Sequence, residues 1–297
     1  MKFDFSADVI GSELLVILLK DRTTEKNIIW ATNDYKEFGE DYFERQEITA
    51  KNFSVIQPNI LKNSGKKKNR VRDKAEIFTP SWLCNEQNNL IDEAWFGRAN
   101  VFNRIIDEQR NCRESPSEKI FFEGEKTWQS YVEANRLEIT CGEAPYLVSR
   151  YDTTSGESIP LENRIGLLDR KLRVVNENTD IKKDWIEWAK KAVQSVYGYE
   201  FQGDNLFLAR KNIFFTYVEN YKKQFEENPD QIILEEIAEI ISWNLWQMDG
   251  LTNKIPYAVA EQNLFDKNSD EKISCQIMDW KKNQAVLFES LLKGGLK

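Results

Sequence analysis

Apolar residues recur along this chain at the spacing of amphipathic helices, and shorter apolar runs separate these blocks. A helix that packs one face against a core places apolar residues three or four positions apart. Together with a serine that follows a proline at the start of one block, this pattern predicts helices at residues 12–20, 81–92, 120–132, 180–198, 206–225 and 232–246. The chain is therefore expected to be rich in helices, with strands between some of them.

Short apolar runs that close on glycine, acidic or amide residues predict the strands. Three of these runs follow one another along the chain, at residues 137–139, 164–169 and 199–205. They close on Gly142, on Asp169 and on the pair Asp204-Asn205. Because the carboxyl ends of parallel strands meet at one edge of a sheet, we expect these residues to lie together. The pattern thus predicts an α/β protein with a parallel sheet.

The turn after residues 137–139 has the most informative local sequence, LEITCGEAPYLV. Gly142 can adopt a positive φ and lets a ligand lie against bare backbone. Strands that turn tightly into helices bind nucleotide-type cofactors at the carboxyl edge of many sheets. The alternative is a structural glycine turn between a core strand and a helix of any kind.

These segments resemble those of the S-adenosylmethionine-dependent DNA amino-methyltransferases, particularly the modification (M) subunits of restriction–modification systems. In that family a Phe-Thr-Pro flap precedes the glycine turn, and Phe78-Thr79-Pro80 matches it. Residues 137–148 look like the first motif of the family, with Glu143-Ala144-Pro145 where a Gly-x-Gly ending is usual. The resemblance covers residues 74–212, roughly half of the chain. It implies a Rossmann-like methyltransferase sheet.

The resemblance also implies a binding site for S-adenosylmethionine. Its residues would be Phe78, Thr79, Pro80, Glu138, Thr140, Cys141, Gly142, Asp169, Asp204 and Asn205. In the family, the flap covers the cofactor and the glycine turn shapes the methionine end of the pocket. Asp169 stands where an acid binds the ribose hydroxyls, and Asp204 stands where an Asp holds the adenine amino group.

The catalytic motif of the family, an Asn or Asp followed by two prolines and an aromatic residue, has no direct counterpart, because the chain contains no Pro-Pro pair. Residues 241–246 contain Asn244 beside aromatic residues, but their spacing favours a helix. Residues 273–280 are expected to form a strand that ends in Asp279-Trp280. Asp279 would then orient the target amino group and Trp280 would stack on the base. The alternative in both segments is a core tryptophan beside a surface polar group.

In the family, further strands of the sheet follow this motif. Here few residues remain between Trp280 and residue 297, which limits the number of strands that can follow. Either the sheet is truncated or a second polypeptide completes it. Residues 252–272 are polar and are expected to form loops.

The composition narrows the classes of function further. With 41% hydrophobic residues a sizeable core is available, and no apolar run is long enough to cross a membrane. No signal-peptide pattern is present, and the four cysteines show no paired metal spacing, so a cytoplasmic protein is expected. The absence of histidine excludes His-based triads and His metal ligands. It does not exclude methyl transfer to an amino group, which depends mainly on positioning.

The charge distribution predicts one local contact with DNA. The net charge of −8 disfavours general binding of nucleic acid, so a contact must come from a local basic cluster. The densest such cluster is formed by Lys66, Lys67, Lys68, Arg70 and Arg72. It is predicted to bind phosphates, and the alternative is a solvated loop.

Two segments and one leading function follow from these observations. Residues 1–73 are predicted to be a helical N-terminal arm with the basic loop, and residues 74–297 a methyltransferase-like cofactor-binding domain. The predicted function is that of an S-adenosylmethionine-dependent DNA methyltransferase, with adenine N6 favoured, or of an M-type subunit that works with a specificity or restriction subunit. The alternative is a non-catalytic cofactor- or DNA-binding subunit of a restriction or defence complex. A restriction nuclease is disfavoured, because no convincing Asp…Glu-x-Lys core is found.

Overall fold

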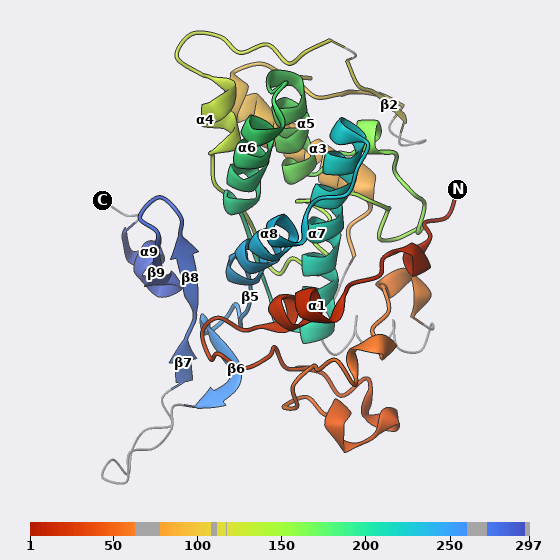
Figure 1. Ribbon diagram of the computed structural model, residues 1–297, viewed down its shortest axis with the longest axis vertical. Coiled ribbons are helices and arrows are strands. Elements are labelled where there is room, and N and C mark those ends of the chain that lie inside the picture. The colour runs from red at the N-terminus through yellow and green to blue at the C-terminus, as the bar shows by residue number, and fades with distance from the viewer. Residues whose placement is uncertain (63–77, 108–111, 117, 260–271, 295–297) are drawn as a thin grey trace.

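The computed structural model describes residues 1–62, 78–107, 112–116, 118–259 and 272–294 (Figure 1). The α-helices of this part are α1 (Ser12–Leu19), α3 (Ser81–Phe96), α4 (Trp128–Val132), α5 (Leu167–Asn178), α6 (Lys182–Gln194), α7 (Gly203–Phe225), α8 (Gln231–Asn244) and α9 (Phe288–Gly294). Its strands are β1 (Arg104–Asp107), β2 (Cys112–Glu114), β3 (Arg136–Glu138), β4 (Val196–Glu200), β5 (Leu245–Gln247), β6 (Lys254–Val259), β7 (Lys272–Ser274), β8 (Gln276–Asp279) and β9 (Gln284–Leu287). Short 3₁₀ helices lie mainly in the first 62 residues.

A small parallel sheet of three strands, in the order β3-β4-β5, forms the centre of the fold. In its register Leu137 pairs with Tyr197, and Gly198 pairs with Leu245. Helices α5 and α6 connect β3 to β4, and α7 and α8 connect β4 to β5. The remaining strands of the described part pair antiparallel, β1 with β2, β6 with β7 and β8 with β9. The protein therefore mixes helices with a small parallel sheet, and all three strands of that sheet end at one edge.

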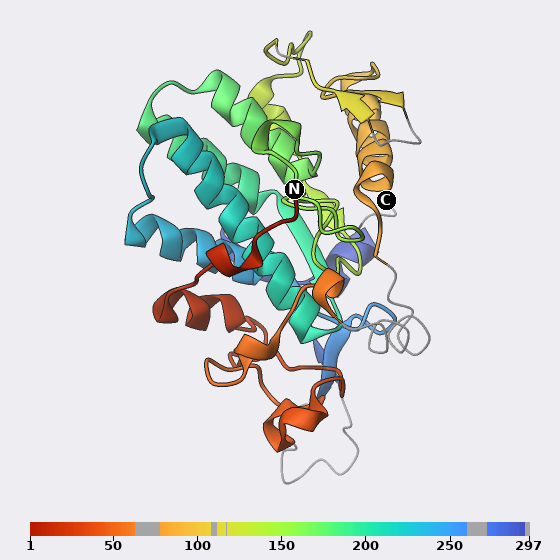
Figure 2. The same ribbon diagram turned by 90° about the vertical axis from the view of Figure 1, so that its right-hand side faces the viewer.

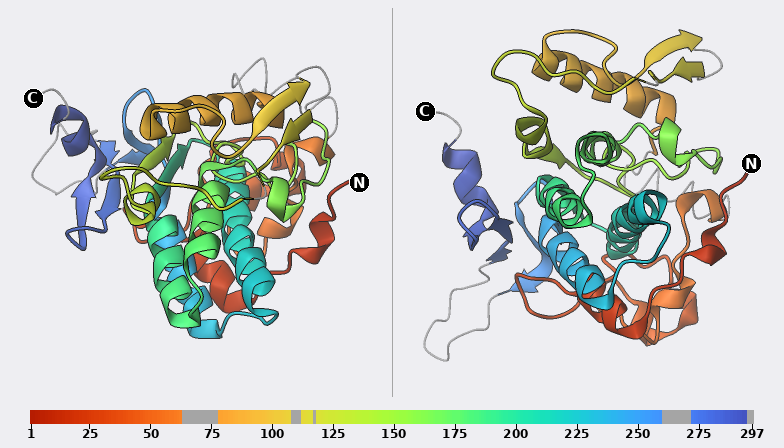
Figure 3. Two further views of the ribbon diagram at one scale, coloured as in Figure 1. Left: turned by 90° about the horizontal axis from the view of Figure 1, so that it is seen from above. Right: turned by 45° about the horizontal axis from the view of Figure 1, so that its top comes forward.

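The two faces of the sheet are covered by different parts of the chain. Val196 and Leu245 belong to the large core formed with the helices. Tyr199 and Trp246 point to the opposite face of the sheet. They pack in a smaller cluster with residues of the two C-terminal hairpins (β6–β7 and β8–β9) and of α9, including Phe288. Successive strand residues point to opposite faces, which explains this division. Figure 3 shows the last hairpin (β8–β9), called the C-terminal hairpin below, and α9 on the side of the molecule away from the N-terminus.

The N-terminal segment shares the large core. Leu18, Trp30 and Ile48 are fully buried in it, and α1 contacts both α7 and α8 (Figure 2). Gly203, at the start of α7, packs directly on this segment, because an added Cβ would lie 2.0 Å from the carbonyl oxygen of Ile29. Any side chain at this position would force the two segments apart.

Most of the predicted helices are confirmed, although their ends shift by a few residues. The block at residues 120–132 is helical only in α4, and the polar block at residues 252–272 contains β6. The strand predicted at residues 164–169 is wrong, because this stretch leads into α5. No helix among the described residues has both the length and the apolar character that a membrane span needs.

Candidate functional site

A pocket of about 710 Å³ opens where β3 and β4 end, and we call it the strand-end pocket. One wall is the segment before α3 together with Gln87, Asn88 and Ile91 of that helix. The opposite wall is formed by residues at the end of β3 and in the turn that follows. The end of β4 and the first turns of α5 and α7 close the pocket. It therefore occupies the edge of a parallel sheet where α/β proteins commonly bind ligands.

The strand-end pocket brings together most of the cofactor-binding residues predicted from the sequence. Those that line it are Phe78, Thr79, Glu138, Thr140, Cys141, Gly142 and Asn205. Pro80, Asp169 and Asp204 do not line it. Pro80 instead precedes α3 as its N-cap residue.

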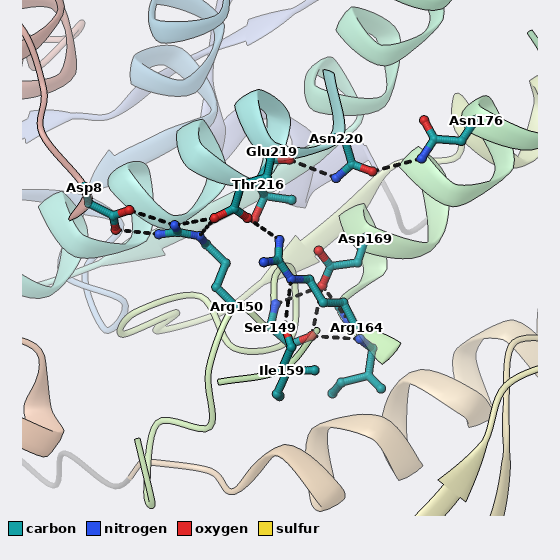
Figure 4. A network of polar contacts seen from close by, with 12 residues as sticks. Asp8, Ser149, Arg150, Ile159, Arg164, Asp169, Asn176, Thr216, Glu219 and Asn220 are labelled. Atoms are coloured by element: carbon teal, nitrogen blue, oxygen red, sulfur yellow. Dashed lines mark hydrogen bonds and ion pairs between the residues drawn. The ribbon is translucent and has the colours of Figure 1, made fainter. Parts of the chain in front are cut away.

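Asp169 caps a helix and does not end a strand, which corrects the sequence interpretation. Its carboxylate accepts hydrogen bonds from the backbone N–H of Gly166 at 3.0 Å, and from the backbone N–H and hydroxyl of Ser149 at 2.8 and 3.0 Å (Figure 4). An acid in the first turn of a helix satisfies backbone donors that have no partner within the helix. These contacts, all made by Oδ2, hold Asp169 at the start of α5, and Asp169 does not line the pocket.

Asp204 is also occupied within the protein. Its buried carboxylate accepts a hydrogen bond from the hydroxyl of Tyr35 at 2.8 Å and forms an ion pair with Lys62 at 3.1 Å. The Lys62 ammonium also donates to Oδ1 of Asn205 at 3.3 Å. Asp204 therefore ties the N-terminal segment to α7, and of the predicted adenine-binding pair only Asn205 reaches the strand-end pocket.

The glycine turn is present, but no helix starts directly after it. Gly142 has a φ of +54°, and Thr140 and Ala144 also have positive φ values, of +47° and +63°. The ring of Phe78 lies 3.8 Å from the position that a Cβ of Gly142 would take, so Phe78 packs close to the turn. The next α-helix is α5, which begins at Leu167. This arrangement differs from the strand–turn–helix corner expected from the sequence.

Two glutamates end neighbouring strands and line the same pocket. Glu138 is the last residue of β3 and Glu200 the last residue of β4. Glu200 accepts hydrogen bonds from the backbone N–H groups of Gly142 at 2.9 Å, Phe201 at 3.0 Å and Gln202 at 3.1 Å. It therefore fixes the glycine turn against the end of β4. Sequence reasoning missed Glu200 because it placed the end of this strand further along the chain.

The environment of Glu138 favours its protonated form. Burial raises the pKa of Glu138 well above 4.5, and the Glu200 carboxylate adds to this effect, although the backbone N–H groups of Tyr146 and Leu147 oppose it. A carboxyl group buried beside a second carboxylate holds its proton to higher pH. The strand-end pocket thus contains a carboxyl that is less acidic than usual.

This raised pKa predicts that Glu138→Gln stabilises the protein more at higher pH. Below the unfolded value of 4.5, both folded and unfolded chains carry the proton and no ionisation cost exists. As pH rises above 4.5 the unfolded chain releases its proton first, so the wild type loses stability relative to the uncharged variant. Thermal denaturation between about pH 4 and pH 8 measures the difference. Glu86→Gln, on the exposed face of α3, is the control, and an E138Q difference that stays constant over this range would contradict the prediction.

Three buried amide atoms at the strand-end pocket have no hydrogen-bond partner among the described residues: Asn88 Oδ1, Gln202 Oε1 and Asn205 Nδ2. The orientation of Asn88 is fixed, because its Nδ2 donates to the carbonyls of Tyr146 and Ile165, each at 3.0 Å. Asn205 is fixed by Lys62, which binds its Oδ1. Buried polar groups nearly always have partners. The residues that line the pocket therefore include an acceptor and a donor of defined orientation that the described residues leave without a partner.

The predicted catalytic pair lies in a different cavity. Asp279 and Trp280 line a cavity of about 460 Å³ between the sheet and the C-terminal hairpin, which we call the junction cavity. Leu137 borders both cavities, but neither Asp279 nor Trp280 lines the strand-end pocket. Asp279 ends a strand as predicted, although β8 pairs antiparallel with β9 and stands outside the parallel sheet. The structure therefore does not bring the predicted catalytic and cofactor-binding residues into one pocket.

Both members of the pair, and the alternative Asn244, have contacts within the protein. The indole N–H of Trp280 donates to Oδ1 of Asn244 at 2.6 Å, and Asn244 donates to the carbonyls of Val193, Gln194 and Val196. Asp279 forms an ion pair with Lys282 at 3.2 Å. Asn244 thus joins α6, β4 and the C-terminal hairpin, and it has no free amide for a target base.

Two further predictions concern DNA and metals. The basic cluster of Lys66, Lys67, Lys68, Arg70 and Arg72 lies outside the described residues. Within the described ranges, no group of three or more His, Cys, Asp or Glu side chains is placed to hold a metal ion.

Comparisons with protein-family models, with curated proteins and with solved structures found no match to this chain.

Proposed function

We propose that this protein binds S-adenosylmethionine in the strand-end pocket and acts as a DNA amino-methyltransferase or as its modification-type subunit. The observation that carries the proposal is the set of unpartnered amide atoms on residues that line a pocket at the carboxyl ends of two adjacent parallel strands. Ligands of open α/β sheets bind at this edge. When bound, S-adenosylmethionine supplies an electrophilic methyl group on its sulfonium.

The chemistry of the pocket wall fits an adenosine-containing ligand. Adenine offers an amino group as donor and ring nitrogens as acceptors. Oδ1 of Asn88 can accept from the amino group and Nδ2 of Asn205 can donate to a ring nitrogen, which would give each orphaned atom a partner. The pocket of about 710 Å³ lies within the usual range for small-molecule sites, about 300–1,000 Å³.

Glu200 is the acid at a strand end that the sequence interpretation expected at Asp169. An acid at the end of the second strand commonly binds the ribose hydroxyls of a nucleotide-type cofactor. Glu200 ends the strand next to β3 and lines the pocket, whereas Asp169 does neither. We therefore assign the ribose to Glu200, while Glu138, Thr140 and Cys141 would shape the methionine end beside Gly142.

A variant of Asn205 tests the cofactor site directly. Asn205→Asp keeps the oxygen that Lys62 binds but replaces the donor Nδ2 by an acceptor. We expect the affinity for S-adenosylmethionine, measured by titration calorimetry, to fall by about 1–3 kcal/mol, because a buried polar group of the ligand then loses its partner. Asn100→Asp introduces the same charge at an exposed position and should leave the affinity unchanged. Wild-type protein that binds neither S-adenosylmethionine nor its demethylated product would refute the cofactor assignment.

The position of Asp279 and Trp280 favours a second candidate, a cofactor-binding subunit that does not catalyse transfer alone. Neither residue lines the strand-end pocket. Transfer of a labelled methyl group to DNA of mixed sequence separates the two functions. Transfer by the chain alone would support the methyltransferase, whereas cofactor binding without transfer would support a subunit that needs a partner.

A further inference from the structure

The junction cavity is lined by residues of the sheet and by residues of the C-terminal hairpin and α9. Leu137, Tyr197 and Trp246 line it from the sheet, and Trp280, Phe288 and Leu291 line it from the C-terminal residues. It is separate from the strand-end pocket except at Leu137, which borders both. Its volume of about 460 Å³ is large enough for a small molecule with one or two rings.

The walls of the junction cavity are held apart by fixed contacts. The indole N–H of Trp280 binds Asn244 at 2.6 Å, and the hydroxyl of Tyr197 donates to the carbonyl of Met278 at 3.2 Å. The rings of Trp246 and Phe288 pack against each other with centroids 5.1 Å apart. These contacts join the sheet, α8 and the hairpin, so closing the cavity by moving the hairpin toward the sheet would break partly buried hydrogen bonds. The cavity is therefore preformed between these elements.

The polar groups of the aromatic wall are already used. Besides the bonds of Trp280 and Tyr197, the indole N–H of Trp246 contacts the sulfur of Met248 at 3.3 Å. Burial, together with the nearby Asp279, raises the pKa of Tyr197 to about 12, so this hydroxyl stays neutral. The aromatic wall therefore offers a ligand ring faces and aliphatic surface, which favours another ring, while Asn135 and Gln194 add polar groups elsewhere in the lining.

Of the four charged lining residues that the structure describes, Glu133, Lys191 and Asp279 form ion pairs, and Lys281 is exposed to solvent. Asp279 pairs with Lys282 at 3.2 Å, and Lys191 lies 3.6 Å from Glu133 and 3.5 Å from Glu187. A charged ligand would have to compete with these pairs and lose its own hydration in an apolar cavity. The lining therefore favours an uncharged ligand.

We propose that the junction cavity is a second ligand site, which binds an uncharged planar aromatic molecule of one or two rings. Binding there would bridge the sheet and the C-terminal hairpin, because the ligand would contact Tyr197 and Trp246 on one side and Trp280 and Leu291 on the other. This proposal does not depend on the identity of the ligand in the strand-end pocket.

Indole is a suitable probe, and α9 supplies a matched pair of variants. Leu291 and Leu292 are neighbours on this helix with similar exposure, 49% and 50%, but only Leu291 lines the cavity. We expect indole to bind the wild type and Leu292→Trp alike in ligand-observed NMR titrations, and Leu291→Trp at least about tenfold more weakly. Val286→Phe, which narrows the cavity from β9, should have the same effect as Leu291→Trp. Thermal denaturation of each variant shows whether the fold is retained.

Charged analogues of the probe test the preference for an uncharged ligand. Indole-3-acetate carries a negative charge and tryptamine a positive charge, and both should bind more weakly than indole. Saturable binding of indole that Leu291→Trp and Val286→Phe reduce, and Leu292→Trp does not, supports the site. Absence of saturable binding to the wild type, equal binding to all variants, or tighter binding of either charged analogue would overturn the proposal.

Discussion

Replacement of Arg210 by methionine is expected to destabilise the protein by about 3–5 kcal/mol. The guanidinium of Arg210 is fully buried and donates to the carbonyls of Leu18, Lys20, Ser242 and Leu245 at distances between 2.6 and 3.2 Å. These carbonyls lie at the C-terminal ends of α1 and α8, where backbone carbonyls have no hydrogen-bond partner within the helix. Methionine fills a similar volume but leaves all of these acceptors without a donor.

Urea denaturation of three variants distinguishes this role from a general effect of lost charge. Arg210→Lys keeps the charge but offers fewer donors in a less rigid geometry, so we expect an intermediate loss. Lys223→Met removes a charge from an exposed position on the same helix and should change stability by less than about 0.5 kcal/mol. A loss below about 1 kcal/mol in Arg210→Met would show that these carbonyls find other partners.

The helices could be predicted because each has one face that must be buried. The apolar residues of α6 and α8 recur at helical spacing, and both helices pack where that pattern requires. The strand predicted at residues 164–169 failed for a related reason. A short apolar run fits a buried strand and the start of a buried helix equally well, and spacing alone does not separate them. In the structure Asp169 caps the helix through Gly166 and also binds Ser149, 20 positions away, a contact that the local pattern does not reveal.

Gly203, which precedes Asp204-Asn205, shows a second limit of prediction from the sequence. A glycine near a strand end indicates a close approach of some kind, either by a ligand or by another part of the chain. At Gly203 the close approach is to Ile29 in the N-terminal segment, whereas at Gly142 the backbone borders a pocket. The two cases look alike along the sequence, because the partner of Gly203 is more than 170 positions away.

Glu200 could have been found from the sequence only with the correct strand ends. The prediction placed the strand at residues 199–205, so the acid that ends it was taken to be Asp204. The strand observed is Val196–Glu200, and α7 then begins at Gly203. A shift of a few residues at a strand end thus exchanged a pocket acid for one that pairs with Lys62. Asn88 belongs to a dense run of amides at residues 85–89 for which the sequence favours contact with water over base reading, whereas its side chain is buried and lines the pocket.

Glu200→Ala is expected to weaken binding of S-adenosylmethionine at least about tenfold. The variant removes the acid assigned to the ribose and leaves the backbone N–H groups of Gly142, Phe201 and Gln202 without their acceptor. The turn after β3 then keeps the bond from the Cys141 N–H to the Tyr199 carbonyl but loses the bond from Gly142, so the pocket wall is less firmly held and a ligand contact is lost. Calorimetry at a temperature where circular dichroism shows a folded chain measures the affinity separately from the loss of stability.

Two further variants make the result specific. Glu200→Gln keeps an oxygen for Phe201 and Gln202 but can turn an amide N–H₂ toward the N–H of Gly142, so its affinity should fall between those of wild type and Glu200→Ala. Glu187→Ala removes an exposed acid of α6 and should bind like wild type. If Glu200→Ala keeps wild-type affinity while Asn205→Asp loses it, the ribose assignment fails and the adenine assignment stands. The two variants thus test the ribose and the adenine of the proposed ligand separately, because Glu200 ends β4 at the glycine turn and Asn205 lies in the first turn of α7.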